Sequence, residues 1–129
     1  MANARILKVS ARQAAVAVVG TGSATISIYD LIHSRQTIDA PNVVLTISDI
    51  AYDVGNTANI KRSGNLIFAC SGGSGEFNLT DSLGVVLNDK ANANVVVDLG
   101  AAEGTMIVQF TKGNGYLDPD RQNQGPGSL

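Results

Sequence analysis

The sequence predicts an all-β protein, an antiparallel β-sandwich or jelly-roll-like barrel of about eight or nine strands with extended terminal arms. Three observations lead to this fold class. Valine and isoleucine, which are β-branched and suit a pleated surface, dominate the apolar residues. Short apolar segments alternate with Gly, Asn, Ser and Asp turns between Ala15 and Lys112. No helical period is sustained along the chain.

The first half of the chain contains three predicted strands. Residues 14–19 and 24–31 are two strand candidates, and the Gly-rich turn at 20–23 predicts that they form a hairpin. Residues 43–54 predict one long strand whose apolar face changes phase at Ser48 and Asp49. A change of phase means that an extra residue is inserted, so we expect a β-bulge or a bend there.

The second half begins with a predicted hairpin. Residues 58–62 and 65–70 flank Ser63 and Gly64, a two-residue turn signal. The glycines and serines of 71–75 predict a flexible linker. Further strands are expected at 76–80, 84–87, 94–99 and 105–111. We expect the three phenylalanines on these strands to be mainly buried: Phe68, Phe77 and Phe110.

At 129 residues, the length fits one domain. We expect an N-terminal strand or arm at 1–13, a β-sandwich domain at 14–112 and a flexible C-terminal tail at 113–129. The N-terminal segment is basic and contains no acid. The C-terminal segment is rich in glycine, proline and polar residues, which cannot form a packed core alone. We expect one or both of these arms to bind a neighbouring protein.

The sequence contains few residues of the types that usually form catalytic sites. It contains one histidine, His33, and one cysteine, Cys70, and its acids are scattered. A metal site needs three or four ligands, and a nucleophilic cysteine needs a base beside it. The glycines at 20 and 22 precede a strand pattern, whereas a nucleotide-binding loop requires a helix there. We therefore expect no enzyme activity, no metal and no cofactor.

Charge and hydropathy argue against two further functions, nucleic-acid binding and membrane association. The isoelectric point is about 5.1, and the basic clusters are not interleaved with aromatic residues, so we expect no nucleic-acid binding. No segment approaches the ~20 apolar residues of a membrane helix, so we expect no membrane association. Only 16% of the residues are charged, which suggests that partners cover part of the surface.

Three segments carry a resemblance to a known group of proteins. They are a strand with Asp and Tyr at 48–54, a basic hairpin at 59–65 and a Gly-rich turn before an aromatic strand at 74–79. In this patterning the chain resembles small β-sandwich proteins of tailed-bacteriophage virions. The resemblance implies a non-enzymatic capsid decoration, or cement, protein that stabilises the assembled shell, or alternatively a tail or neck component.

This resemblance also implies partners and a location. The partner would be the major capsid protein or another virion protein, with self-association, preferentially as a trimer. The protein would be made in the host cytoplasm and reside on the capsid surface. A carbohydrate- or receptor-binding β-sandwich is the alternative class. The residues expected to contact a partner are Arg5, Lys8, Arg12, Lys61, Arg62, Tyr116 and Leu117.

Overall fold

The structure is a computed structural model that describes residues 2–33, 36–78, 92–113 and 115–117. The strand expected at 84–87 lies outside these residues, as do the last two residues of the strand expected at 76–80. The described elements comprise nine β-strands and two short 3-10 helices. They are β1 (Asn3–Val9), β2 (Gln13–Gly20), β3 (Ser23–Ile26), η1 (Ile28–Leu31), β4 (Thr37–Ile38), η2 (Ala40–Asn42), β5 (Leu45–Arg62), β6 (Asn65–Asn78), β7 (Val95–Asp98), β8 (Gly104–Lys112) and β9 (Tyr116–Leu117).

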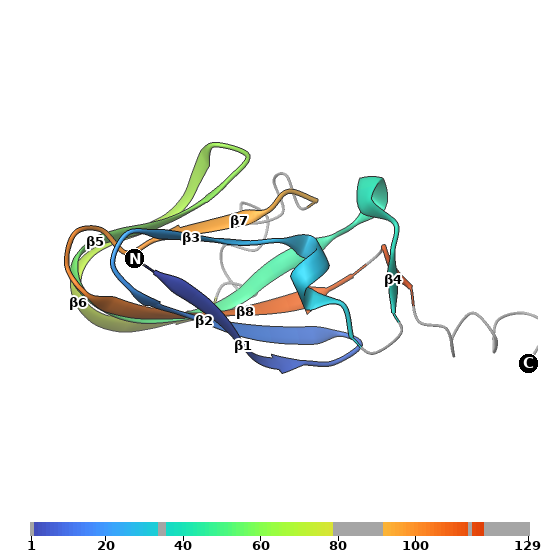
Figure 1. Cartoon of the computed structure of the whole chain (residues 1–129), viewed down its shortest axis with the longest axis horizontal. Helices are drawn as coiled ribbons and strands as arrows, with labels where there is room; N and C mark the ends of the chain where they lie inside the picture. The colour runs from blue at the N-terminus through green and yellow to red at the C-terminus, as the bar shows by residue number, and fades with distance from the viewer. Residues whose placement is uncertain (1, 34–35, 79–91, 114, 118–129) are drawn as a thin grey trace, which may run out of the picture.

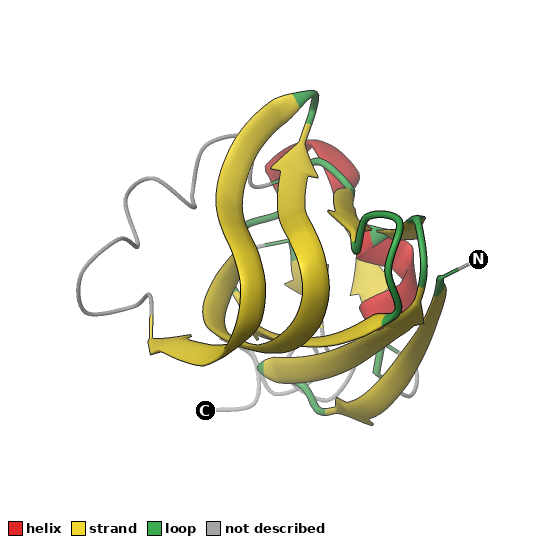
Figure 2. Cartoon of the chain, turned by 90° about the vertical axis from the view of Figure 1, so that its left-hand side faces the viewer, coloured by secondary structure: helices red, strands yellow, loops and turns green. Residues whose placement is uncertain are grey.

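Strand β5 organises the main sheet. Along one edge it pairs with β6, its partner in a long antiparallel hairpin. Along the other edge it pairs first with β8, from Leu45 to Val54, and then with β7, from Asn59 to Arg62. The β5–β6 register shifts between Val54 and Thr57, and Figure 2 shows the two strands bending together. Because of this bend, the two halves of β5 lie in different layers of the barrel.

The result is a nearly closed, barrel-like antiparallel sheet, which confirms the predicted fold class. The strand order is β1-β2-β8-β5-β7-β3, with β6 paired to β5. One layer contains β1, β2, β8 and the first half of β5, and the other contains β3, β7 and the second half of β5 (Figure 1). Alternate side chains of both layers fill the space between them, including Val18, Val108 and Phe110 from the first and Ile26, Ile60 and Val97 from the second.

Several local predictions are confirmed. The register of β5 with β8 shifts between Ile47 and Asp49, where the change of apolar phase predicts a bulge. The β5–β6 hairpin turns at Ser63 and Gly64, which both have positive φ values. This conformation matches the right-handed twist of the flanking strands and favours glycine.

Two local predictions are wrong. The segment 71–75 is not a linker but part of strand β6. Its glycines at 72 and 73 have positive φ values and lie where the hairpin bends. The strands β2 and β3 do not pair with each other: β2 pairs with β1 and β8, and β3 pairs with β7. The Gly-rich turn instead connects one layer to the other. Gly22 donates its N–H to the carbonyl oxygen of Gly100 and accepts from the N–H of Leu99, each at 2.8 Å.

Both expected arms contribute strands to the described structure. Residues Asn3–Val9 form β1 at the edge of the main sheet. At the other end, β9 pairs with β4 in a small two-stranded sheet. Gly115, just before β9, lies so close to Val43 that a Cβ atom there would be 2.5 Å from the Val43 Cα atom. Residues 118–129 lie outside the described structure.

Candidate functional site

Strand β1 is the most exposed strand of the barrel. Six consecutive residues, Asn3 to Lys8, are exposed to solvent. In the described structure β1 is at one end of the sheet order and pairs only with β2. Its other edge therefore presents backbone N–H and C=O groups that no neighbouring strand binds. Such an edge is a template for an additional strand.

The free edge of β1 borders a groove between the two layers. Strand β3 is at the opposite end of the sheet order, and β1 and β3 diverge from the point where the chain begins (Figure 1). The groove has a volume of about 370 Å³ and is lined by Ala4, Ile6, Val16, Thr25, Ile26 and Asp30. Val16 and Ile26 form its buried floor, while Ile6 is 46% exposed at its rim. The sheet is thus open where its two end strands face each other.

A rigid turn holds the polar end of this groove. Ser27 caps the helix η1: its Oγ accepts a hydrogen bond from the Tyr29 backbone N–H at 3.1 Å. In return, Asp30 Oδ2 accepts from the Ser27 backbone N–H at 2.9 Å. This reciprocal capping box fixes the Asp30 carboxylate at one end of the apolar groove.

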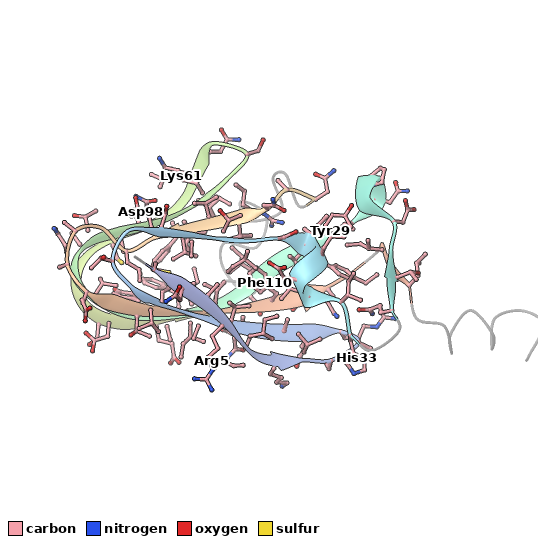
Figure 3. All side chains as sticks on the ribbon, viewed as in Figure 1. Arg5, Tyr29, His33, Lys61, Asp98 and Phe110 are labelled. Atoms are coloured by element: carbon pink, nitrogen blue, oxygen red, sulfur yellow. The ribbon has the colours of Figure 1, made fainter. Side chains whose placement is uncertain are left out.

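The outer face of β1 carries two cations. Arg5 lies opposite Ala17, and Lys8 lies opposite Ala15, with a register shift between Ile6 and Lys8 that leaves Leu7 as the extra residue. The bulge brings both cations to the side opposite the core, and Figure 3 shows Arg5 pointing away from the barrel. Strand β2 contains no charged residue, so β1 faces no acid from its neighbour.

The other residues expected to contact a partner do not gather at this site. Arg12 is exposed just beyond β1, Lys61 is exposed near the tip of the β5–β6 hairpin, and Leu117 is exposed on β9. Arg62 and Tyr116 are buried. Strand alternation turns both side chains inward, so neither is part of the described surface.

The buried Arg62 is a structural residue. Its Nη1 donates to the carbonyl oxygen of Leu45 at 2.6 Å. Its Nε and Nη2 donate to the carbonyl oxygen of Ala93 at 3.3 and 3.0 Å. Burial lowers the pKa of Arg62 to about 10, and the nearby Tyr116 phenol opposes this shift. The guanidinium remains charged at neutral pH and connects the start of β5 to the residues before β7.

Lys112 and Tyr116 form a second buried polar contact at the same end of the barrel. Lys112 Nζ donates to the carbonyl oxygen of Leu31 and to Gln36 Oε1, both at 2.7 Å. The ammonium lies 4.9 Å from the centre of the Tyr116 ring. Tyr116 Oη donates to the carbonyl oxygen of Ile28 at 2.7 Å. These bonds attach the connection between β3 and β5 to the C-terminal strands.

The environment of Tyr116 predicts a loss of stability at high pH. Burial raises the pKa of Tyr116 well above its usual value of 10.0, although Arg62 lowers it in part. The folded protein therefore retains this proton at a pH where the unfolded chain has lost it, so the free energy of unfolding falls as the pH rises above about 10. We expect denaturant midpoints between about pH 9 and pH 11 to fall more steeply for the unsubstituted protein than for Tyr116→Phe. Parallel pH profiles for the two proteins would contradict this assignment.

An aromatic cluster lies on the hairpin, where the sequence predicts a buried core. The rings of Tyr52, Phe68 and Phe77 have centroids 5.4 to 6.4 Å apart. Phe77 is 44% exposed and Phe68 is half-buried, so only Phe110 of the three phenylalanines is fully buried. The prediction of burial is wrong for Phe77 because β6 pairs with β5 alone in the described structure. Tyr52 covers Gly75, where a Cβ atom would meet its hydroxyl at 2.6 Å.

The groups that favour catalysis are not assembled in the described part of the chain. His33 is exposed after η1, whereas Cys70 is half-buried on β6 opposite Ala58. Burial raises the pKa of the Cys70 thiol, which disfavours the reactive thiolate. Among the described residues, no three His, Cys, Asp or Glu side chains are placed to hold a metal ion. The same residues include no helix with the length and hydrophobicity needed to cross a membrane.

Comparison with known proteins finds no matching family model and no matching curated protein. Three solved structures are similar to the chain. KdgF from Halomonas sp. has 11% identity and a TM-score of 0.40, over 88% of this chain and 80% of the other. A cupin superfamily protein from Desulfitobacterium hafniense has 11% identity and a TM-score of 0.38, over 87% and 77%. A double-stranded β-helix protein from Klebsiella pneumoniae has 7% identity and a TM-score of 0.41, over 91% and 84%.

These comparisons correct the function expected from the sequence. The similar structures are cupin-type and double-stranded β-helix proteins, and none of the three is a virion protein. The assignments as a viral, capsid-decoration or bacteriophage protein have no support in these comparisons and are withdrawn. The patterning that suggested them is a property of short antiparallel strands and tight turns, which many β proteins share.

Proposed function

We propose that the chain is a non-enzymatic binding module that holds an extended segment of a partner protein as an additional strand on β1. The observation that carries this proposal is the unpaired edge of β1 beside the groove. A bound segment would form backbone hydrogen bonds with β1, and its alternate side chains would enter the groove. In this mode of recognition, the main-chain ladder supplies affinity and the side-chain contacts supply specificity.

Two features of the groove support an extended segment over a compact ligand. The groove runs beside β1, and an extended segment would pair along the part of β1 that diverges from β3 (Figure 1). Four of the groove's six lining residues are aliphatic, and Asp30 contributes one fixed carboxylate. A segment lying there would also cover Ile6, whose exposure at an edge otherwise invites unspecific association.

A synthetic peptide tests this proposal directly. The probe has about seven residues, alternates valine with glutamine and is blocked at both ends, so that it carries no charge. We expect it to bind, measured by fluorescence anisotropy, and to slow hydrogen exchange of the β1 amides, which strand addition protects. A control peptide with proline at its centre, which lacks one N–H donor and disrupts the ladder, should bind far more weakly.

A pair of matched variants locates the site. Ile6 and Leu66 are both exposed, at 46% and 60%, so lysine should be tolerated at either position. Only Ile6 lines the groove. We expect Ile6→Lys to weaken peptide binding about tenfold, since an apolar contact of ~1–1.5 kcal/mol is lost, and Leu66→Lys to leave binding unchanged. Equal binding by both variants, or no binding of the valine–glutamine peptide to the unsubstituted protein, would show that β1 is not the site.

A further inference from the structure

We infer that the segment bound on β1 belongs to an acidic partner: its outward-facing side chains are aspartate or glutamate, and its inward-facing side chains are small and aliphatic. This inference deepens the proposed function and rests on it. It follows from two observations: the outer face of β1 carries two cations, and the groove on the inner side is lined by aliphatic residues and Asp30 of η1.

The outer face of β1 carries positive charge that no acid of β2 neutralises. Arg5 and Lys8 are exposed, and they lie opposite alanines of β2. An added strand would run about 4.8 Å from β1, which places its outward side chains directly beside these cations. Opposite charges across neighbouring strands stabilise the pair, and like charges destabilise it. An acidic outer face is therefore complementary to Arg5 and Lys8.

The inner side of the site favours uncharged, aliphatic side chains on the bound segment. A bound segment directs its inward side chains over Val16 and Ile26, which are buried and aliphatic. Asp30 stands at one end of the groove, held by its bond to the Ser27 N–H. A carboxylate pointing inward would lose its hydration and face a like charge, both of which are unfavourable. The bound segment is thus expected to alternate between acidic and aliphatic residues.

The same charges disfavour a second copy of this chain as the occupant. Pairing of β1 with β1 of another copy would gather two arginines and two lysines on one face of two adjacent strands. Neither β1 nor β2 contains an acidic residue that could neutralise them. Repulsion between these cations opposes the pairing. Charge repulsion therefore makes pairing of two β1 strands less favourable than binding of an acidic segment to β1.

Three peptides of one design test the charge class. They share inward-facing valines and differ only at the outward positions, which are glutamate, glutamine or lysine. We expect the glutamate peptide to bind about tenfold more tightly than the glutamine peptide, since two exposed pairs supply up to ~1 kcal/mol each. The lysine peptide should bind most weakly. Raising the salt from about 0.05 M to about 0.5 M should reduce the glutamate preference, because exposed charges are screened.

Variants of the cations separate this inference from the proposed function. The double substitution Arg5→Ser with Lys8→Ser should abolish the preference for glutamate, measured as the ratio of the affinities for the glutamate and glutamine peptides. Lys61→Ser removes an exposed cation on the distant hairpin and should preserve the preference. If the glutamine peptide binds β1 but the glutamate peptide binds no more tightly, the charge inference is wrong and the proposed function stands. If none of the peptides binds, both are wrong. A stable dimer whose β1 amides are protected without peptide would also overturn the acidic occupant.

Discussion

Arg62→Ala is expected to lower the free energy of unfolding by about 3–5 kcal/mol, because it removes the donors to one buried and one partly buried carbonyl group and leaves a cavity. The Arg62 side chain is fully buried and donates to the carbonyl oxygens of Leu45 and Ala93. The bond to Leu45 is buried, so water cannot replace the guanidinium there, whereas the bonds to Ala93 are only partly buried. Denaturant unfolding with a common slope for all variants measures the effect.

Two further variants identify the source of this loss. Arg62→Met restores most of the side-chain volume without the hydrogen bonds, and we expect a loss of about 2–3 kcal/mol. Lys61→Ala removes the neighbouring cation, which is exposed, and should change stability by less than about 0.5 kcal/mol. If Arg62→Met were as stable as the unsubstituted protein, the hydrogen bonds would contribute nothing and only the packing of Arg62 would matter.

Phe110→Ala is expected to cost about 3–5 kcal/mol, the usual range for a phenylalanine truncated in a close-packed core. Phe110 is 1% exposed, on β8, between Ala14 of β2 and Ile47 of β5. Both neighbouring strands are fixed by long ladders, so the surrounding side chains have little freedom to fill the cavity. Thermal and denaturant unfolding provide independent measurements.

The matched comparison is Phe77→Ala, on the exposed part of the aromatic cluster. Phe77 keeps 44% of its surface in contact with solvent, so its removal creates an indentation and no enclosed cavity. We expect a loss of about 1 kcal/mol, mainly from the contacts with Tyr52 and Phe68. Equal losses at Phe77 and Phe110 would mean that the cluster is covered by further parts of the molecule.

Local sequence patterns predicted the strands better than their pairing. The phase change at Ser48 and the turn at Ser63 and Gly64 are local features, and both occur where the residues indicate. Pairing depends on which distant strand offers a complementary face. The Gly-rich turn at 20–23 is compatible with a hairpin, but β1 and β8 already pair with the two edges of β2. Strand β3 therefore pairs elsewhere.

The candidate site could be predicted only in part. The basic N-terminal segment predicts a strand or an arm, and the structure shows a strand, β1, which carries Arg5 and Lys8. The groove depends on two strands from different layers and has no local signature. Arg62 and Tyr116 were expected at the surface because a charged or polar residue near a turn usually lies there. Their burial is possible because backbone carbonyl groups at this end of the barrel accept their hydrogen bonds.

The architecture of the sheet also has a consequence for the order of folding. The β5–β6 hairpin closes through a two-residue turn, whereas the β2–β8 ladder joins Gln13 to Thr111, near opposite ends of the described chain. A short loop loses little entropy on closure, and a long one loses more before any contact compensates. The hairpin therefore forms early, and the layer containing β1 is completed last. The groove beside β1 is lined by residues of both layers, so it exists only once the two layers have been joined.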